Sequence, residues 1–95
     1  TRLFQNYPNP FSQSTVIRLE IPISNSQLPI TLTIYDLSGR LVRTLIDKPI
    51  TSHQSPITIT WDGKDNLSSP VPSGIYFCQL KTQDLCVTKK MIIMR

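Results

Sequence analysis

Glycine and histidine are both scarce in this chain of 95 residues, which has three glycines and one histidine. Three glycines are too few for a glycine-rich loop that binds phosphate groups. The histidine, His53, lies in a Pro-flanked loop without a cysteine or carboxylate close to it in sequence, so we interpret it as a solvated side chain. The six acids show no spacing typical of a catalytic dyad. We therefore expect a protein that is not an enzyme and that uses no metal or other cofactor.

Long apolar runs and clusters of charge are missing as well. No stretch approaches the roughly 20 apolar residues of a transmembrane helix, and the N-terminus lacks the pattern of a signal peptide. The ten basic residues are scattered, and only Lys89 and Lys90 are adjacent. Because nucleic-acid binders concentrate their basic residues, we expect no nucleic-acid partner. The chain begins at Thr1 rather than at a methionine, and we expect it to be part of a larger secreted protein.

The sequence does contain a repeated alternation of apolar and polar residues, which is typical of half-buried strands. Eight prolines, Pro29 among them, indicate turns between these strands, as do several short polar stretches. The strands expected from this pattern are Thr15–Ile21, Ile30–Ile34, Leu41–Ile46, Ile57–Trp61, Gly74–Lys81 and Leu85–Met94. The pattern predicts one all-β domain. We expect an immunoglobulin-like antiparallel β-sandwich of about seven strands in residues 12–95, after an extended N-terminal segment, residues 1–11.

Several residues have a predicted structural role. Gly39 and Gly74 are expected at positive φ, which a Cβ disfavours. Trp61 is expected in the core with its indole N–H bonded at the rim, and Tyr76 in the core with its hydroxyl bonded to a nearby loop. The stretch Asp62–Asn66 has a superficial likeness to a calcium loop, but it lacks the alternating oxygen ligands and the distal Glu of an EF-hand. We expect its side chains to cap turns instead.

Cys78 and Cys86 lie in the two expected strands that flank the turn Thr82–Asp84. If this hairpin is centred on Thr82, the two cysteines fall opposite each other, at a Cα separation that a disulfide permits. The hypothesis is a cross-strand disulfide, which fits an exported protein. The alternative is two buried free thiols, since a shift of register by one residue would turn the two side chains to opposite faces.

Five motifs follow one another in an order and spacing found in a known family: Asn6–Phe11, Ile34–Arg40, Thr60–Asp65, Pro72–Phe77 and Lys89–Ile93. Through them the chain resembles the type A C-terminal sorting domains of the type IX secretion system. It is also similar to the immunoglobulin-like domain of flagellar hook-capping proteins. The motif residues that carry the resemblance are Asn6, Pro8, Asn9, Pro10, Tyr35, Asp36, Gly39, Trp61, Asp62, Gly63, Gly74 and Tyr76. The chain departs from the family in two expected loops, His53–Pro56 and Leu67–Ser69, where the family often has a glycine.

The resemblance implies a sorting signal that directs a larger cargo protein across the outer membrane to the cell surface or the medium. It implies three partners: the outer-membrane secretion machinery, a sorting peptidase, and a cargo domain linked covalently at the N-terminus. The residues expected to be recognised are Lys89, Lys90, Met91 and Arg95. Lysines on an edge strand also prevent aggregation, so a purely structural role stays open for them.

Two other classes of function stay open. One is a non-catalytic structural or protein-interaction module, of the hook-capping or adhesion kind. The other is a carbohydrate-binding module, which would need a platform of exposed aromatic side chains. Most of the seven aromatic residues are expected in the core, which disfavours that second class.

Overall fold

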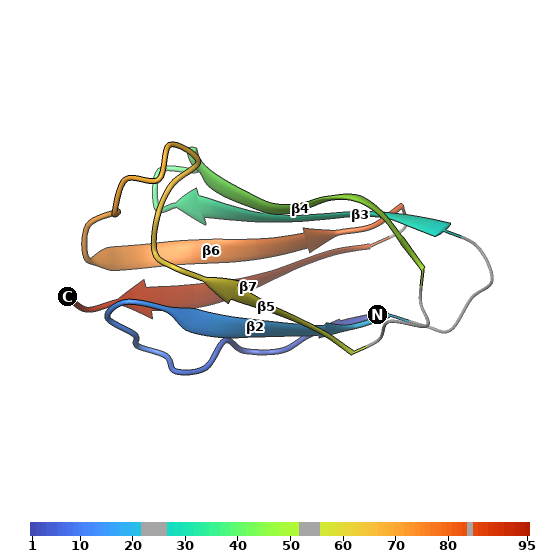
Figure 1. Ribbon diagram of the computed structural model, residues 1–95, viewed down its shortest axis with the longest axis horizontal. Helices are drawn as coiled ribbons and strands as arrows, with labels where there is room; N and C mark the ends of the chain where they lie inside the picture. Colours follow the sequence, from blue (N-terminus) through green and yellow to red (C-terminus); the bar gives the residue numbers. More distant parts are fainter. Residues whose placement is uncertain (22–26, 52–55, 84) are drawn as a thin grey trace.

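The structure is a computed structural model that describes residues 1–21, 27–51, 56–83 and 85–95. It contains seven strands in two antiparallel sheets (Figure 1). The three-stranded sheet has the order β1-β2-β5 and the four-stranded sheet the order β4-β3-β6-β7. The strands are β1 (Arg2–Leu3), β2 (Thr15–Glu20), β3 (Gln27–Asp36), β4 (Leu41–Thr51), β5 (Ile57–Trp61), β6 (Gly74–Lys81) and β7 (Cys86–Ile93). The predicted all-β sandwich of about seven strands is confirmed.

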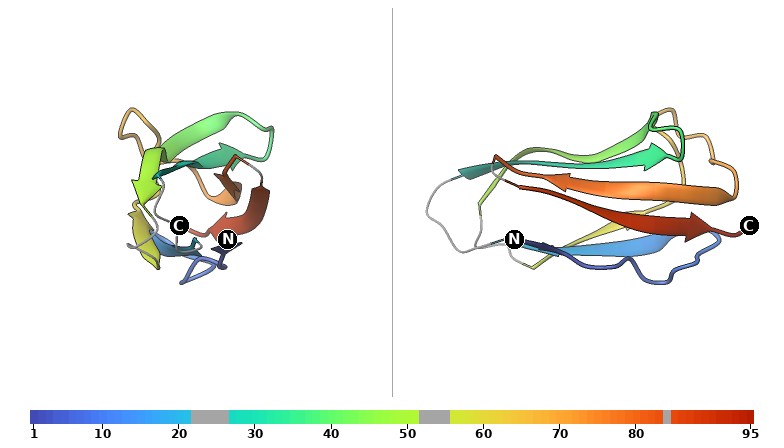
Figure 2. Two further views of the ribbon diagram at one scale, coloured as in Figure 1. Left: turned by 90° about the vertical axis from the view of Figure 1, so that its right-hand side faces the viewer. Right: turned by 180° about the vertical axis from the view of Figure 1, so that it is seen from behind.

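The core lies between the two sheets, which form separate layers (Figure 2). Alternate residues of each strand point into it, as in β2, where Ile17 and Leu19 are buried while Val16 and Arg18 are exposed. Burial of each such apolar side chain contributes roughly 1.5–3 kcal/mol to the free energy of unfolding. The alternation of apolar and polar residues in the sequence therefore determines both where the strands form and which face of each strand is buried.

The strands β3 and β4 are longer than the sequence pattern predicts, and Pro29 lies inside β3 rather than in a turn. Pro29 is directly opposite Pro49 of β4. The pairing of β3 with β6 ends at Thr31, so Pro29 belongs to a part of the sheet that has only two strands. A proline is tolerated there because one edge of the strand needs no backbone donor.

The predicted disulfide between Cys78 and Cys86 is wrong. In the hairpin of β6 and β7, Cys78 pairs with Lys89 and Cys86 pairs with Lys81. The register is therefore shifted by three residues from a hairpin centred on Thr82, and an odd shift turns the two sulfur atoms to opposite faces of the sheet. Cys78 is buried and Cys86 is exposed, and both are free thiols.

The N-terminal segment, residues 1–11, pairs with one sheet and then with the other. It begins as β1 beside β2 and forms an isolated bridge between Tyr7 and Val16. The peptide bonds before Pro8 and Pro10 are cis. The segment ends at Phe11, which pairs in parallel with Ile93 of β7. It thus connects the edges of the two sheets on the side of the sandwich where the C-terminal strand lies (Figure 2).

Candidate recognition site at the C-terminal end of the sandwich

One end of the sandwich gathers most of the sequence motifs. We call it the distal end and define it as the turn Asp36–Arg40, the loop 62–73 and Arg95. The C-terminus lies at this end, whereas the N-terminus lies towards the other end (Figure 1). A chain segment preceding Thr1 would therefore start away from the distal end.

Three aromatic side chains form the core of the distal end. The ring of Trp61 packs edge-on against Phe11 and against Tyr76, with ring centroids 5.7 Å apart in both pairs. Trp61 is fully buried, and its indole N–H donates to the carbonyl of Lys64 at 2.9 Å. The hydroxyl of Tyr76 donates to the carbonyl of Pro72 at 2.7 Å, and burial raises the pKa of this hydroxyl. Both predicted roles are confirmed.

Asp36 fixes the turn between β3 and β4. One oxygen of its carboxylate accepts hydrogen bonds from the Ser38 hydroxyl at 2.6 Å and from the backbone N–H groups of Ser38 and Arg40. These donors favour the ionised form and lower the pKa of Asp36 from 3.8 to about 2. Gly39 has a φ of 89° and Gly74 a φ of 156°, so the predicted positive φ at both glycines is confirmed.

The acids of the loop 62–73 bond to the backbone of that loop. Asp62 accepts from the backbone N–H of Lys64, and Asp65 accepts from the N–H groups of Leu67 and Ser69. This confirms the expected turn capping. In the part of the chain that the structure describes, no cluster of three or more His, Cys, Asp or Glu side chains could hold a metal ion. His53 lies outside the described residues.

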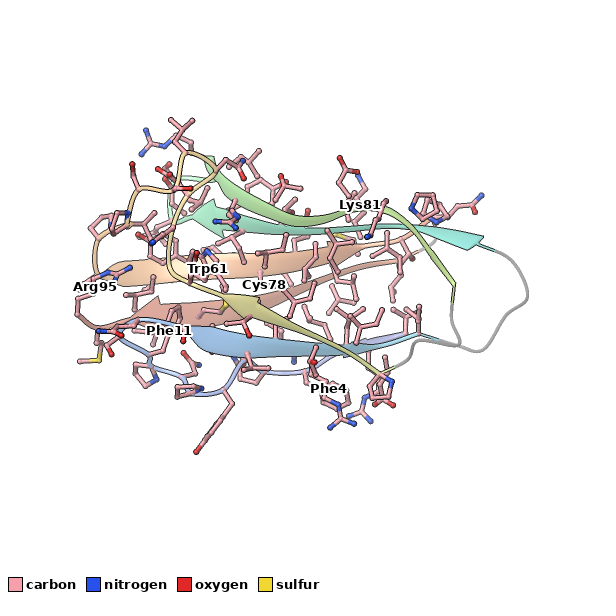
Figure 3. All side chains as sticks on the ribbon, in the orientation of Figure 1. Phe4, Phe11, Trp61, Cys78, Lys81 and Arg95 are labelled. Carbon is pink, nitrogen blue, oxygen red and sulfur yellow. The ribbon has the colours of Figure 1, made fainter. Side chains whose placement is uncertain are left out.

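Arg95 lies at the distal end (Figure 3) and bonds to three separate segments of the chain. Its guanidinium donates to the carbonyl oxygens of Ser12, Gly63 and Val71 at 3.0, 2.9 and 2.8 Å. Its backbone N–H donates to the Ser73 hydroxyl. Sequence reasoning did not anticipate these contacts, because the partners lie between 22 and 83 positions away along the chain.

The other residues expected to be recognised have different environments. Lys90 is exposed, whereas Lys89 is half-buried, because alternate residues of a strand face opposite sides of the sheet. Lys89 is directly opposite the buried Cys78 and therefore lies on the core side of β7. Met91 is 0% exposed, so a receptor that binds the folded domain does not contact it. The assignment of Met91 to a contact surface is therefore corrected: it is a core residue.

The outer backbone edge of β7 is occupied by the N-terminal segment. Phe11 donates its N–H to the carbonyl of Ile92 and accepts from the N–H of Met94, at 3.0 and 2.8 Å. Asn9 accepts from the N–H of Ile92 through its side chain, and the Gln5 amide donates to the carbonyl of Lys90. The motif at the start of the chain thus pairs with the motif at its end.

A family model of the secretion system C-terminal sorting domain matches residues 5–94. The chain belongs to this family. It is a sorting signal of type IX secretion, and the cargo that carries such a signal is exported to the cell surface or the medium. The family match favours this function over a hook-capping or adhesion module. No curated protein matches the chain.

The sorting domain is similar to parts of two solved structures from Porphyromonas gingivalis. One is dimeric latent PorU, with a TM-score of 0.72 and 28% identity over 94% of this chain. The other is PorZ, an essential bacterial surface component of the type IX secretion system, with a TM-score of 0.65 and 18% identity over 98% of this chain. The domain covers only 9% of the PorU chain and 11% of the PorZ chain.

Among the described residues, no helix is long and apolar enough to cross a membrane.

Proposed function

We propose that this sorting domain is the C-terminal part of a larger secreted protein and that the secretion machinery recognises it as a folded unit. We define the recognition surface as Lys90, Ile92, Met94 and Arg95. The first three are alternate residues of the chain and therefore point to one face. The domain acts as a signal and catalyses no reaction.

The contacts at the edge of β7 are the observation that carries this proposal. Peptide recognition by strand addition needs a free row of backbone donors and acceptors. Here the carbonyl of Lys90 and both backbone groups of Ile92 already bond to the N-terminal segment. A receptor cannot add a strand at this edge of β7 unless it first displaces residues 5–11, which favours recognition through the side chains of the recognition surface.

The exposed side chains of this surface combine apolar area with positive charge. Met94 is 63% exposed, and Ile75, which pairs with Ile92, is 36% exposed. Among the described residues, ion pairs with carboxylates are formed by Arg40 and Arg43 alone, so Lys90 has no acidic partner. An unpaired charge next to exposed apolar side chains is typical of an interaction site. We infer that the receptor surface is acidic with an apolar centre.

The proposed route follows from the place of the domain in the larger protein. The cargo would precede Thr1 and cross the inner membrane with its own signal peptide. The domain would then fold in the periplasm and meet the outer-membrane machinery, and a sorting peptidase would remove it at the cell surface. The N-terminus lies away from the distal end, so the cargo would leave the distal end and its Arg95 accessible (Figure 2).

An export assay tests this proposal. The domain is fused to the C-terminus of a periplasmic fluorescent reporter in a bacterium with a type IX secretion system. We expect the fusion on the cell surface or in the medium. The reporter without the domain, and the fusion in a strain that lacks the system, should stay in the periplasm. Periplasmic retention of the fusion with a folded domain would contradict the proposal and favour an interaction module.

A further inference from the structure

The outer face of the four-stranded sheet contains a groove whose lining does not include any residue of the recognition surface. Its volume is about 490 Å³, and its floor is formed by side chains of β3, β4 and β6. It lies on the face opposite the core, because the residues of β3 that line it alternate with the buried Ile30, Leu32 and Ile34.

The side chains in this groove form rows across the sheet. In the central row, Thr33 of β3 lies between Thr44 of β4 and Gln79 of β6. In the next row, Thr31 lies between Asp47 and Lys81. The central row is uncharged, and the neighbouring row has one negative and one positive side chain. The groove as a whole is therefore polar without a net charge.

The polar side chains of these rows have unused hydrogen-bonding capacity. In the part of the chain that the structure describes, the hydroxyls of Thr31, Thr33 and Thr44 and the amide of Gln79 form no hydrogen bond with another residue. All four residues are half-buried, so their positions are restricted by neighbouring side chains. A ligand with many hydroxyl groups could bond to all of them at once.

Each end of the groove has a ring side chain. Tyr35 lies at one end and is half-buried, and Phe77 is directly opposite it on β6. Pro29 lies at the other end, six positions along the same strand. At about 3.3 Å per residue, the two ends are roughly 20 Å apart. The groove therefore fits an elongated ligand, with an aromatic face at one end.

We propose that this groove binds a neutral oligosaccharide. A sugar has hydroxyl groups around its rim and apolar C–H groups on its faces, which match the threonine and glutamine rows and the ring of Tyr35. A nucleic acid or another polyanion would need an excess of basic side chains. A peptide would need a free backbone edge or an apolar pocket for an anchoring side chain.

Titration calorimetry with the 95-residue chain tests the proposal. The probes are hexasaccharides derived from dextran, mannan and galactan, each at low and at high salt. We expect saturable binding of at least one of them, with an affinity that salt does not change, because no net charge is involved. Binding that is lost at high salt would contradict recognition through uncharged side chains and would overturn the proposal. Failure of all three probes to bind would also overturn it.

Variants locate the site on the molecule. Tyr35→Ala should weaken binding about tenfold, equivalent to about 1.4 kcal/mol, whereas Tyr35→Phe, which keeps the ring, should bind almost normally. Thr33→Val removes one hydroxyl at nearly constant volume and should weaken binding severalfold. The matched control is Thr58→Val, an exposed threonine of β5 in the other sheet. Equal binding by Tyr35→Ala and the unmodified domain would overturn the proposal. Export of the reporter fusion is a separate readout, so failure of sugar binding and failure of sorting are distinguishable.

Discussion

The Arg95 guanidinium lies against the backbone of Gly63. Its Nη2 donates to the Gly63 carbonyl at 2.9 Å, and a Cβ added to Gly63 would lie 2.6 Å from the same nitrogen. The Gly63 carbonyl also accepts from the N–H of Val71. The last residue of the chain thus connects the Trp-Asp-Gly loop to the segment before β6, and the glycine is needed for the close approach.

Substitution of Gly63 should therefore cost more than substitution of a glycine in open space. We expect Gly63→Ala to reduce the free energy of unfolding by about 2–4 kcal/mol, through the contacts of its Cβ and a φ of 71°. The matched control is Gly39→Ala, where φ is 89° but no atom lies within 4 Å of the added Cβ; it should cost about 1–2 kcal/mol. Urea denaturation followed by the fluorescence of Trp61 measures both. Equal losses would contradict the contact between Arg95 and Gly63.

Removal of the Arg95 side chain should destabilise the fold. Arg95→Ala leaves three backbone carbonyls without their charged donor, and we expect a loss of about 1–3 kcal/mol in the free energy of unfolding. Lys90→Ala serves as the control, because an exposed side chain without an ion pair should change stability by less than about 0.5 kcal/mol. Similar urea midpoints for the two variants would show that Arg95 does not hold these segments together.

The two cysteines should react at different rates. Cys86 is exposed, so a thiol reagent should label it in the native domain at neutral pH. Cys78 is buried, and burial raises the pKa of its thiol to about 12, so it should react only after unfolding. Mass spectrometry without a reducing agent should show one label per native chain and two per unfolded chain. An unfolded chain without reactive thiols would restore the disulfide hypothesis.

The contribution of Asp36 to stability should depend on pH. Its pKa is lowered from 3.8 to about 2 in the folded domain, so the ionised carboxylate stabilises the fold fully above about pH 4. That stabilisation is lost as the pH falls from about 4 through 2. The melting temperature of Asp36→Asn should therefore be below that of the unmodified domain at pH 6, and the difference should shrink towards pH 2. A difference that stays constant over this range would contradict the role of the ionised carboxylate.

Features that depend on local sequence could be predicted. The alternation in Thr15–Glu20 and Ile57–Trp61 gives the strands and their buried faces, and the positive φ of Gly39 follows from its place in a turn. The buried rings of Trp61 and Tyr76, with their hydrogen bonds to nearby loops, follow from the size and polarity of these side chains.

Features that the local sequence does not specify could not be predicted from it. The register of the hairpin of β6 and β7 places Cys78 and Cys86 on opposite faces of the sheet. This register depends on the length of the turn, and the short polar residues between the two strands do not specify that length. Nothing in the sequence near Arg95 indicates carbonyl partners in three other segments. Tyr35 and Phe77 are half-buried on the outer face of their sheet, and this depends on which face of their strands the core occupies. The expectation that most of the seven aromatic residues lie in the core is therefore wrong, because only Phe11, Trp61 and Tyr76 are buried there.

The measurement that tests the proposed recognition surface most directly compares two charge reversals in the reporter fusion. Lys90→Glu changes the recognition surface, whereas Lys48→Glu makes the same change at an exposed lysine of β4. Melting temperatures of the two purified domains establish that both are folded. We predict that Lys90→Glu leaves the reporter in the periplasm and that Lys48→Glu exports it like the unmodified fusion. Normal export of a folded Lys90→Glu domain would contradict recognition through this surface.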